Sequence, residues 1–221
     1  MTLNPFTSPS SSDEALQRIQ GFGVPVRFKR KQLLWTEGEL ADGVFLLGSG
    51  SVKLFRQHGE RRVTLDLAHR GELIGIEGAS KGARRGASAM ALSSIRGVFV
   101  DGARMRELAS KQPRVMDLLL GTQVRRNQTF AKDLEDLATL SVEQRLATRL
   151  LTIGNSIGLP DARGVFIPLR LTRVELSEMA WCRSETVIRL MTRWQEQGLV
   201  CTQREGIILR EPEQLKVLAQ G

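Results

Sequence analysis

The segment RSETVIR, residues 183–189, places an acidic and a basic side chain four residues apart. On a helix this spacing puts Glu185 and Arg189 on one face, with Ile188 between them. In the major groove of DNA a glutamate can accept a hydrogen bond from cytosine N4, an arginine can pair with guanine, and an apolar side chain can pack on a thymine methyl. We therefore predict that these three residues read base pairs; an ordinary surface ion pair is the alternative.

The residues around this segment carry groups that can hold the DNA backbone. Hydroxyl and guanidinium groups bind phosphates, which position a protein on DNA without reading its sequence. Ser184, at the start of the helix, is placed to reach either a base edge or a phosphate. The expected phosphate contacts are Thr172, Arg173, Arg183 and Thr186.

The other side of the same helix is apolar, and its members recur at the helical period, so it is predicted to be buried. This stripe consists of Val187, Leu190, Met191 and Trp194. Another short helix is expected before it, separated by AWCRS, and LVCTQREGIILR is typical of a hairpin with residues 204–206 at its tip. Residues 141–221 are therefore predicted to form a winged helix-turn-helix.

Local signals mark the start of this unit. Ser141 and Gln144 have the spacing of a capping box, so a helix begins here, and residues 139–141 are a candidate hinge. Residues 154–166, which contain Gly, Pro and Asn, are expected to be a loop.

A long helix is predicted over residues 113–140, with Pro113 in its first turn, where proline is tolerated. Its seam alternates spacings of four and three residues, as in a coiled coil, and two polar members in the middle can fix the register. We interpret it as the joint of a parallel homodimer; the alternative is a helix that packs this stripe on its own barrel. The seam consists of Met116, Leu120, Gln123, Asn127, Phe130, Leu134 and Leu137.

Residues 21–112 contain short apolar runs separated by glycines, the pattern of an all-β roll or barrel. A hairpin tip is expected at Gly59 in QHGERR, because glycine takes a positive φ without strain. The segment MTLNPFTSPSSS is expected to be mobile, and tail and lead-in together span residues 1–20.

Together these segments resemble the CRP/FNR family of bacterial transcription regulators. RSETVIR is similar to the family's recognition helix, LLWTEGELADGVFLLGSGSVKLFR and GELIG to its cyclic-nucleotide-binding barrel, and LATLSVEQRLATRLL to its hinge. The resemblance implies an α+β fold: a cyclic-nucleotide-binding-like jelly roll (β-roll), a long dimerisation helix and a C-terminal winged helix-turn-helix. It also implies a homodimer that binds palindromic double-stranded DNA and contacts RNA polymerase.

The chain departs from this family at the effector pocket. Members that respond to cyclic AMP hold its phosphate with an arginine followed by Ser or Thr, whereas here Ala87 precedes Ser88. The resemblance offers Glu72, Leu73, Arg84, Arg85 and Ser88 as pocket residues. They give no support to cyclic AMP or cyclic di-GMP, so no cofactor is expected. Alternatively Glu72 caps a strand end, and the two arginines support bent DNA.

Other departures lie outside the pocket. Trp181 occupies the turn between the two short helices, where family members commonly have glycine. A bulky residue is strained in a left-handed conformation, so we expect a reshaped turn. Phe130 and Ala131 stand where the family's base-contacting hydroxyls are expected on the central helix.

Charge and cysteine content restrict the function less than these motifs do. The formal net charge is +8, but residues 21–112 hold 16 Lys and Arg against 9 Asp and Glu, and residues 141–221 hold 11 against 9. Charge alone therefore does not mark the C-terminal part as the DNA-binding part. Two histidines and two cysteines make a metal site unexpected. Cys182 is a candidate for redox control, because a helix N-terminus favours the thiolate.

Absent motifs exclude other classes of function. With no apolar run long enough to span a membrane and no secretion signal, a cytoplasmic location is expected. An enzyme is not expected, since the sequence has no phosphate loop, HExxH or nucleophile elbow. The chain is interpreted as a sequence-specific transcription regulator; the alternative is a nucleotide or dinucleotide sensor whose output is protein contact.

Overall fold

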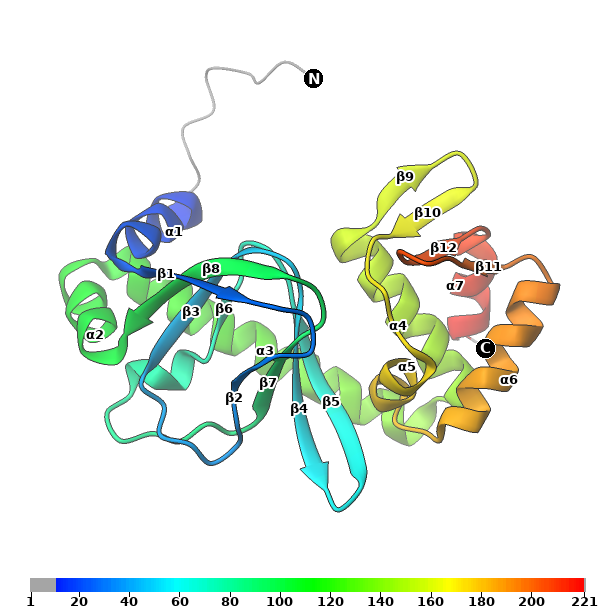
Figure 1. Ribbon diagram of the computed structural model, residues 1–221, viewed down its shortest axis with the longest axis horizontal. Helices are drawn as coiled ribbons and strands as arrows, with labels where there is room; N and C mark the ends of the chain where they lie inside the picture. Colours follow the sequence, from blue (N-terminus) through cyan, green and yellow to red (C-terminus); the bar gives the residue numbers. More distant parts are fainter. Residues whose placement is uncertain (1–10, 221) are drawn as a thin grey trace.

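The computed structural model describes residues 11–220 (Figure 1). Its N-terminal part is a roll of two four-stranded antiparallel sheets, ordered β1-β8-β3-β6 and β2-β7-β4-β5, as predicted for residues 21–112. Gly59 has a φ of 59° at the tip of the β4–β5 hairpin, which confirms that prediction. The elements are β1 (Val24–Phe28), β2 (Leu33–Trp35), β3 (Gly43–Ser49), β4 (Val52–His58), β5 (Arg61–Ala68), β6 (Leu73–Ile74), the 3₁₀ helix η1 (Ile76–Ala79), β7 (Ser88–Ala91) and β8 (Ile95–Asp101).

Two helices at the end of the roll were not predicted: α1 (Ser11–Phe22) and α2 (Gly102–Lys111). Residues 11–20 therefore belong to a helix and are not a mobile lead-in, while residues 1–10 lie outside the described residues. Ala15 and Ile19 of α1 are buried in one cluster with Leu108 of α2. This contact stabilises α1. It could not be predicted from the N-terminal sequence, whose composition is mostly polar.

A single long helix, α3 (Pro113–Thr139), runs behind the roll and on to the C-terminal part (Figure 1). Val115 and Leu119 are buried against the roll cluster that contains Leu46 and Leu73. The predicted seam lies on another face: its five apolar members are 38–68% exposed, and Gln123 and Asn127 are exposed as well. The alternative in which α3 packs this seam on its own roll is therefore wrong.

The C-terminal part contains the predicted helix-turn-helix and wing. Ser141 and Gln144 form the predicted capping box at the start of the first helix. The expected loop over 154–166 is wrong, because the first helix continues to Ile157 and two further strands follow and extend the wing sheet to the order β11-β12-β10-β9. The elements are α4 (Val142–Ile157), β9 (Leu159–Asp161), β10 (Gly164–Ile167), α5 (Arg173–Ala180), α6 (Ser184–Glu196), β11 (Val200–Thr202), β12 (Ile207–Leu209) and an unpredicted α7 (Pro212–Gln220).

The turn between α5 and α6 is left-handed at its tryptophan. Trp181 adopts a left-handed conformation, with φ 54° and ψ 49°, so the expectation of a reshaped turn is wrong. Its indole nitrogen donates to the Thr64 carbonyl oxygen of β5 at 3.0 Å, and the Arg149 guanidinium lies 4.9 Å from the ring centre. These contacts offset the backbone strain, which is of the order of 1–2 kcal/mol.

None of the helices in residues 11–220 is long and apolar enough to cross a membrane.

Replacement of Trp181 by Gly and by Ala separates this strain from the side-chain contacts. Both variants lose the indole, but only Ala keeps the cost of positive φ, so the Gly variant should be more stable by about 1 kcal/mol. Melting temperatures measure the difference, expected to be about 2–4 °C. As a control, Ala180→Gly, one residue earlier and inside α5, should be destabilising. A Trp181→Gly variant that melts at or below Trp181→Ala would show that the turn is unstrained.

Candidate nucleic-acid interface

The recognition face predicted from the sequence is exposed along the first turns of α6. Glu185 and Arg189 are exposed, and Ile188 is 48% exposed although it is apolar. Within the described residues no ion pair joins Glu185 to Arg189, so the surface-pair alternative gains no support. The opposite stripe is buried at Val187, Met191 and Trp194, while Leu190 is partly buried.

The predicted phosphate contacts are only partly free. Arg183 is exposed at the N-cap of α6, and Ser184 and Thr186 are partly exposed beside it. Thr172 is occupied as the N-cap of α5, where its hydroxyl donates to the Glu175 carboxylate at 2.9 Å. Arg173 donates to the Thr202 hydroxyl at 3.0 Å, and burial lowers its pKa. The structure therefore brings together one group of residues at the start of α6, with Arg183, Glu185, Ile188 and Arg189 exposed and Ser184 and Thr186 partly exposed.

An acidic residue of α4 holds α6 in place, a role that the sequence did not indicate. The Glu143 carboxylate accepts from the Trp194 indole at 3.0 Å and forms an ion pair with Arg193. Burial alone would raise the pKa of Glu143, but the hydrogen bonds from Arg193 and Trp194 outweigh it and lower the pKa. The carboxylate therefore stays charged at neutral pH and joins α4 to α6.

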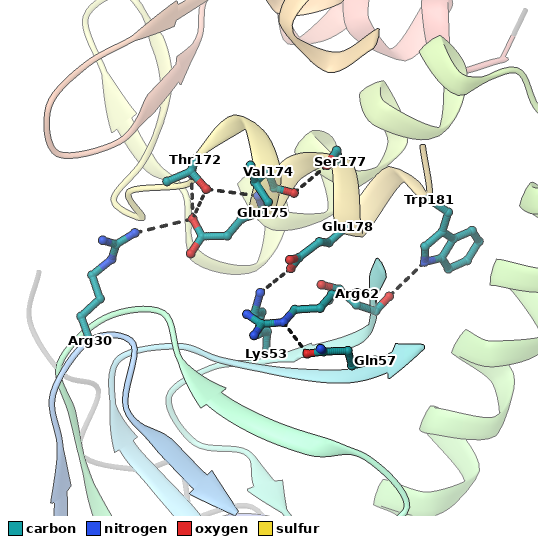
Figure 2. Close-up of polar contacts among 11 residues, drawn as sticks. Arg30, Lys53, Gln57, Arg62, Thr172, Val174, Glu175, Ser177, Glu178 and Trp181 are labelled. Carbon is teal, nitrogen blue, oxygen red and sulfur yellow. Dashed lines mark hydrogen bonds and ion pairs between the residues drawn. The ribbon is translucent and has the colours of Figure 1, made fainter. Parts of the chain in front are cut away.

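The roll holds α5 and the segments next to it through polar contacts (Figure 2). A buried ion pair joins Lys53 of β4 to Glu178 of α5, with side chains 2% and 9% exposed. Arg30 approaches the Glu175 carboxylate at 3.5 Å and donates to the Arg170 carbonyl oxygen at 3.1 Å. With the Trp181 bond to β5, these contacts dock the helix-turn-helix on the roll of its own chain.

Sequence reasoning missed this docking surface because each partner is unremarkable on its own. The one available signal was Lys53, a charged residue inside the apolar run SVKLF of a predicted strand. A lysine in such a position is buried only if it is paired.

The five residues expected to form an effector pocket are not brought together. The Glu72 carboxylate accepts from the backbone N–H of His69 at 2.8 Å, which is the capping role given as its alternative. The Ser88 hydroxyl accepts from the backbone N–H of Glu37, and Arg84 donates to the Gly38 carbonyl oxygen. Leu73 is buried in the roll.

Arg85 lies in the interior of the roll. Its side chain is 1% exposed and its guanidinium lies 4.4 Å from the centre of the Trp35 ring. It donates to Asp42 at 2.9 Å and to the carbonyl oxygens of Gly43 and Gly75 at 2.8 and 3.0 Å, which leaves only Nε without a partner in the described structure. Arg85 therefore cannot support bent DNA, as one alternative proposed.

Cys182 is a weaker candidate for redox control than the sequence suggested. The residue is partly exposed, and burial raises the pKa of its thiol although Arg145 opposes the shift. The thiolate is the reactive form of cysteine, and a raised pKa disfavours it. The environment of Cys182 therefore opposes the activation expected from the N-terminus of α6.

A cavity of about 300 Å³ lies where the roll, α3 and the DNA-binding part meet; we call it the junction cavity. It is lined by β5 and α3 on one side and by α4 and Met179 of α5 on the other. Of the expected effector residues only Glu72 and Leu73 line it. The described residues contain no cluster of three or more His, Cys, Asp or Glu able to hold a metal.

Comparison with known proteins agrees with this architecture. Residues 25–112 match the cyclic nucleotide-binding domain, and residues 144–218 match the Crp-like helix-turn-helix domain. The CRP-like cAMP-activated global transcriptional regulator of Mycobacterium tuberculosis is 24% identical over 192 residues, 86% of each chain. The transcriptional activator protein Anr of Pseudomonas protegens is 26% identical over 210 residues, which cover 94% of this chain and 84% of Anr.

Solved structures share the fold. FixK2 from Bradyrhizobium japonicum superposes with a TM-score of 0.78 at 20% identity, over 89% of this chain and 96% of FixK2. The c-di-GMP responsive global regulator CLP from Xanthomonas campestris superposes with a TM-score of 0.75 at 19% identity, over 89% of this chain and 98% of CLP.

A cyclic nucleotide-binding-type roll joined by one long helix to a helix-turn-helix defines a class of DNA-binding transcription regulators. Within that class the chain belongs to the CRP/FNR family.

The Lys53–Glu178 pair can be tested by removing one partner or both. Lys53→Met leaves Glu178 buried without a partner, a change that costs about 3–5 kcal/mol, whereas Lys53→Met with Glu178→Leu removes both charges and should recover most of that loss. Thermal unfolding of the three proteins measures the effect, with the exposed pair Lys111–Glu107 as the control, for which Lys111→Met should change little. A double variant no more stable than Lys53→Met would refute the docking role of this pair.

Proposed function

We propose that this protein is a sequence-specific transcription regulator that binds a palindromic DNA site as a homodimer through its two α6 helices. The exposed group Glu185, Ile188 and Arg189, on a helix whose opposite side is buried, carries the proposal. An α-helix fits the major groove, and these side chains match the base edges there. The likeness to the activator Anr supports RNA polymerase as a further partner.

The uncovered seam of α3 supports the homodimer. Leu120 and Leu134 are 57% and 68% exposed, and the other apolar residues of the seam are exposed as well. A stripe of this kind is stabilised when a second copy packs against it as in a coiled coil. A dimer would then present its recognition helices to half-sites roughly 34 Å apart along the duplex.

We also propose that the roll does not bind cyclic AMP in the way that cyclic-AMP-responsive family members do. Ser88 is bonded to the backbone of Glu37, and Arg85, which is buried in the roll, is bonded to the protein itself. A nucleotide phosphate would have to displace these partners. The match to a cyclic nucleotide-binding domain supports a ligand-binding ancestry of the fold and does not identify a ligand.

Selection of bound sequences from a random DNA pool tests the proposed function. The full chain is used alone, with cyclic AMP and with cyclic di-GMP. Enrichment of one palindrome by the protein alone is the expected result. Enrichment only with cyclic AMP would identify it as the effector and overturn the proposal for the roll, whereas enrichment only with cyclic di-GMP would identify that nucleotide as the effector. If no sequence were enriched in any of the three conditions, DNA recognition as proposed would be wrong.

Arg189→Ala is expected to relax the preference at one G·C pair in each half-site. The lost pair with guanine is worth about 1–3 kcal/mol of discrimination, and repeating the selection with the variant measures it. Arg183→Ala is the matched control, because a phosphate contact should weaken binding to all sequences and lower the salt dependence without changing the preferred sequence. An unchanged preference in Arg189→Ala would refute the assignment.

Leu134→Lys is expected to convert the protein to a monomer. The side chain is well exposed in the single chain, so the fold tolerates a lysine, but the dimer would have to bury the charge against its partner. Sedimentation analysis measures the mass, and operator affinity should fall with it. Gln128→Lys, an exposed position of the same helix outside the seam, should remain dimeric. A dimeric Leu134→Lys variant would show that the copies associate elsewhere.

A further inference from the structure

The junction cavity contains a buried hydroxyl that the protein leaves without a partner. Thr64 of β5 lines the cavity, is 5% exposed, and has no hydrogen bond to its hydroxyl oxygen from any described residue. A buried polar group without a partner is unfavourable and rare in native proteins, so it calls for a bound group that satisfies it. Among the described residues the other such atom is Nε of Arg85, which lies in the roll and does not line this cavity.

Three arginines, Arg125, Arg126 and Arg149, and two acids, Asp66 and Glu72, line the cavity. Arg126 is paired with Asp66 at 3.3 Å, and Arg149 with Asp133 at 2.7 Å. Arg125, which lines the same cavity, has no acidic partner in the described part of the chain and only donates to the Thr122 hydroxyl at 3.3 Å. A site with one unpaired guanidinium favours an anion.

Further lining groups call for hydroxyls on the same ligand. The hydroxyls of Thr122, Thr129 and Thr152 donate to carbonyl oxygens of their own helices, at 2.8, 3.1 and 2.8 Å, so their remaining capacity is to accept. Asp66 adds a titratable group, because burial raises its pKa to about 6 in spite of Arg126. Leucine side chains, with Ile153 and Met179, form the apolar part of the lining, and about 300 Å³ is at the small end of ligand pockets.

We propose that the junction cavity binds a small hydroxylated organic anion, a hydroxycarboxylate or a sugar phosphate. Its anionic group pairs with Arg125 and accepts from Thr64, and its hydroxyls donate to the threonine oxygens of α3 and α4. Such a ligand touches β5 and α3 on one side and α4 on the other, so it bridges the roll and the DNA-binding part. That this ligand regulates DNA binding rests on the proposed function, whereas its binding to the junction cavity does not.

Melting temperatures of the full chain with citrate, with glucose 6-phosphate and with sulfate test the site. One of the two hydroxylated anions should raise the melting temperature by about 5–10 °C at about 100-fold excess over Kd. Citrate and glucose 6-phosphate separate a carboxylate from a phosphate ligand. Sulfate is the anion without hydroxyls and should give a clearly smaller shift.

Two variants assign the shift to this cavity. Thr64→Val removes the unpartnered hydroxyl, so it should melt at or above the wild type without ligand and lose most of the ligand-induced shift. Arg125→Gln should also lose that shift, and Arg104→Gln, an exposed arginine of α2 outside the cavity, should keep it.

The proposal is overturned if neither hydroxylated anion stabilises the wild type, if the shift survives both variants, or if sulfate gives an equal shift. These melting-temperature measurements need no DNA, so they test the cavity even if the selection enriches no DNA sequence. Where selection succeeds, the bound anion should change operator affinity in the wild type and not in Thr64→Val.

Discussion

The buried contact that docks the DNA-binding part on the roll is the ion pair of Lys53 with Glu178. Both groups lose their hydration, and only their pairing makes that burial tolerable. Because Lys53 lies within β4 and Glu178 within α5, the pair joins the face of α5 that carries Glu178 to the roll. α6 follows after a short turn, and its recognition residues Glu185, Ile188 and Arg189 are exposed. The same docking creates the junction cavity between β5, α3 and α4.

Trp181 shows how docking and the helix-turn-helix are coupled. A glycine would take the left-handed turn without cost, but it would give no contact with the roll. The tryptophan accepts backbone strain and gains a bond to the Thr64 carbonyl oxygen and a contact with Arg149. Arg149 in turn pairs with Asp133 across the junction of α3 and α4. The turn that orients α6 is thus tied to the strand and the helix that line the cavity.

What the sequence predicted correctly depends on short-range patterns. The capping box at Ser141, the hairpin at Gly59 and the apolar stripe of α6 each involve residues a few positions apart, where spacing alone defines the contact. The missed features pair residues far apart in the chain: α1 needs α2 and α3, and Lys53 needs a partner 125 positions away. The predicted roles of Arg85 were wrong for the same reason, because alignment to a motif does not reveal that its guanidinium is buried and stacked on Trp35.

Arg85 also explains why the roll and the junction differ as places for a ligand. In the roll its guanidinium and the carbonyl oxygens of Gly43 and Gly75 satisfy one another, apart from Nε. A ligand there must first break internal bonds, and each acceptor left unpaired adds a penalty. At the junction Thr64 and Arg125 hold donors that no described residue fully uses. A small anion can therefore bind at the junction without that cost, directly between the elements that position α6.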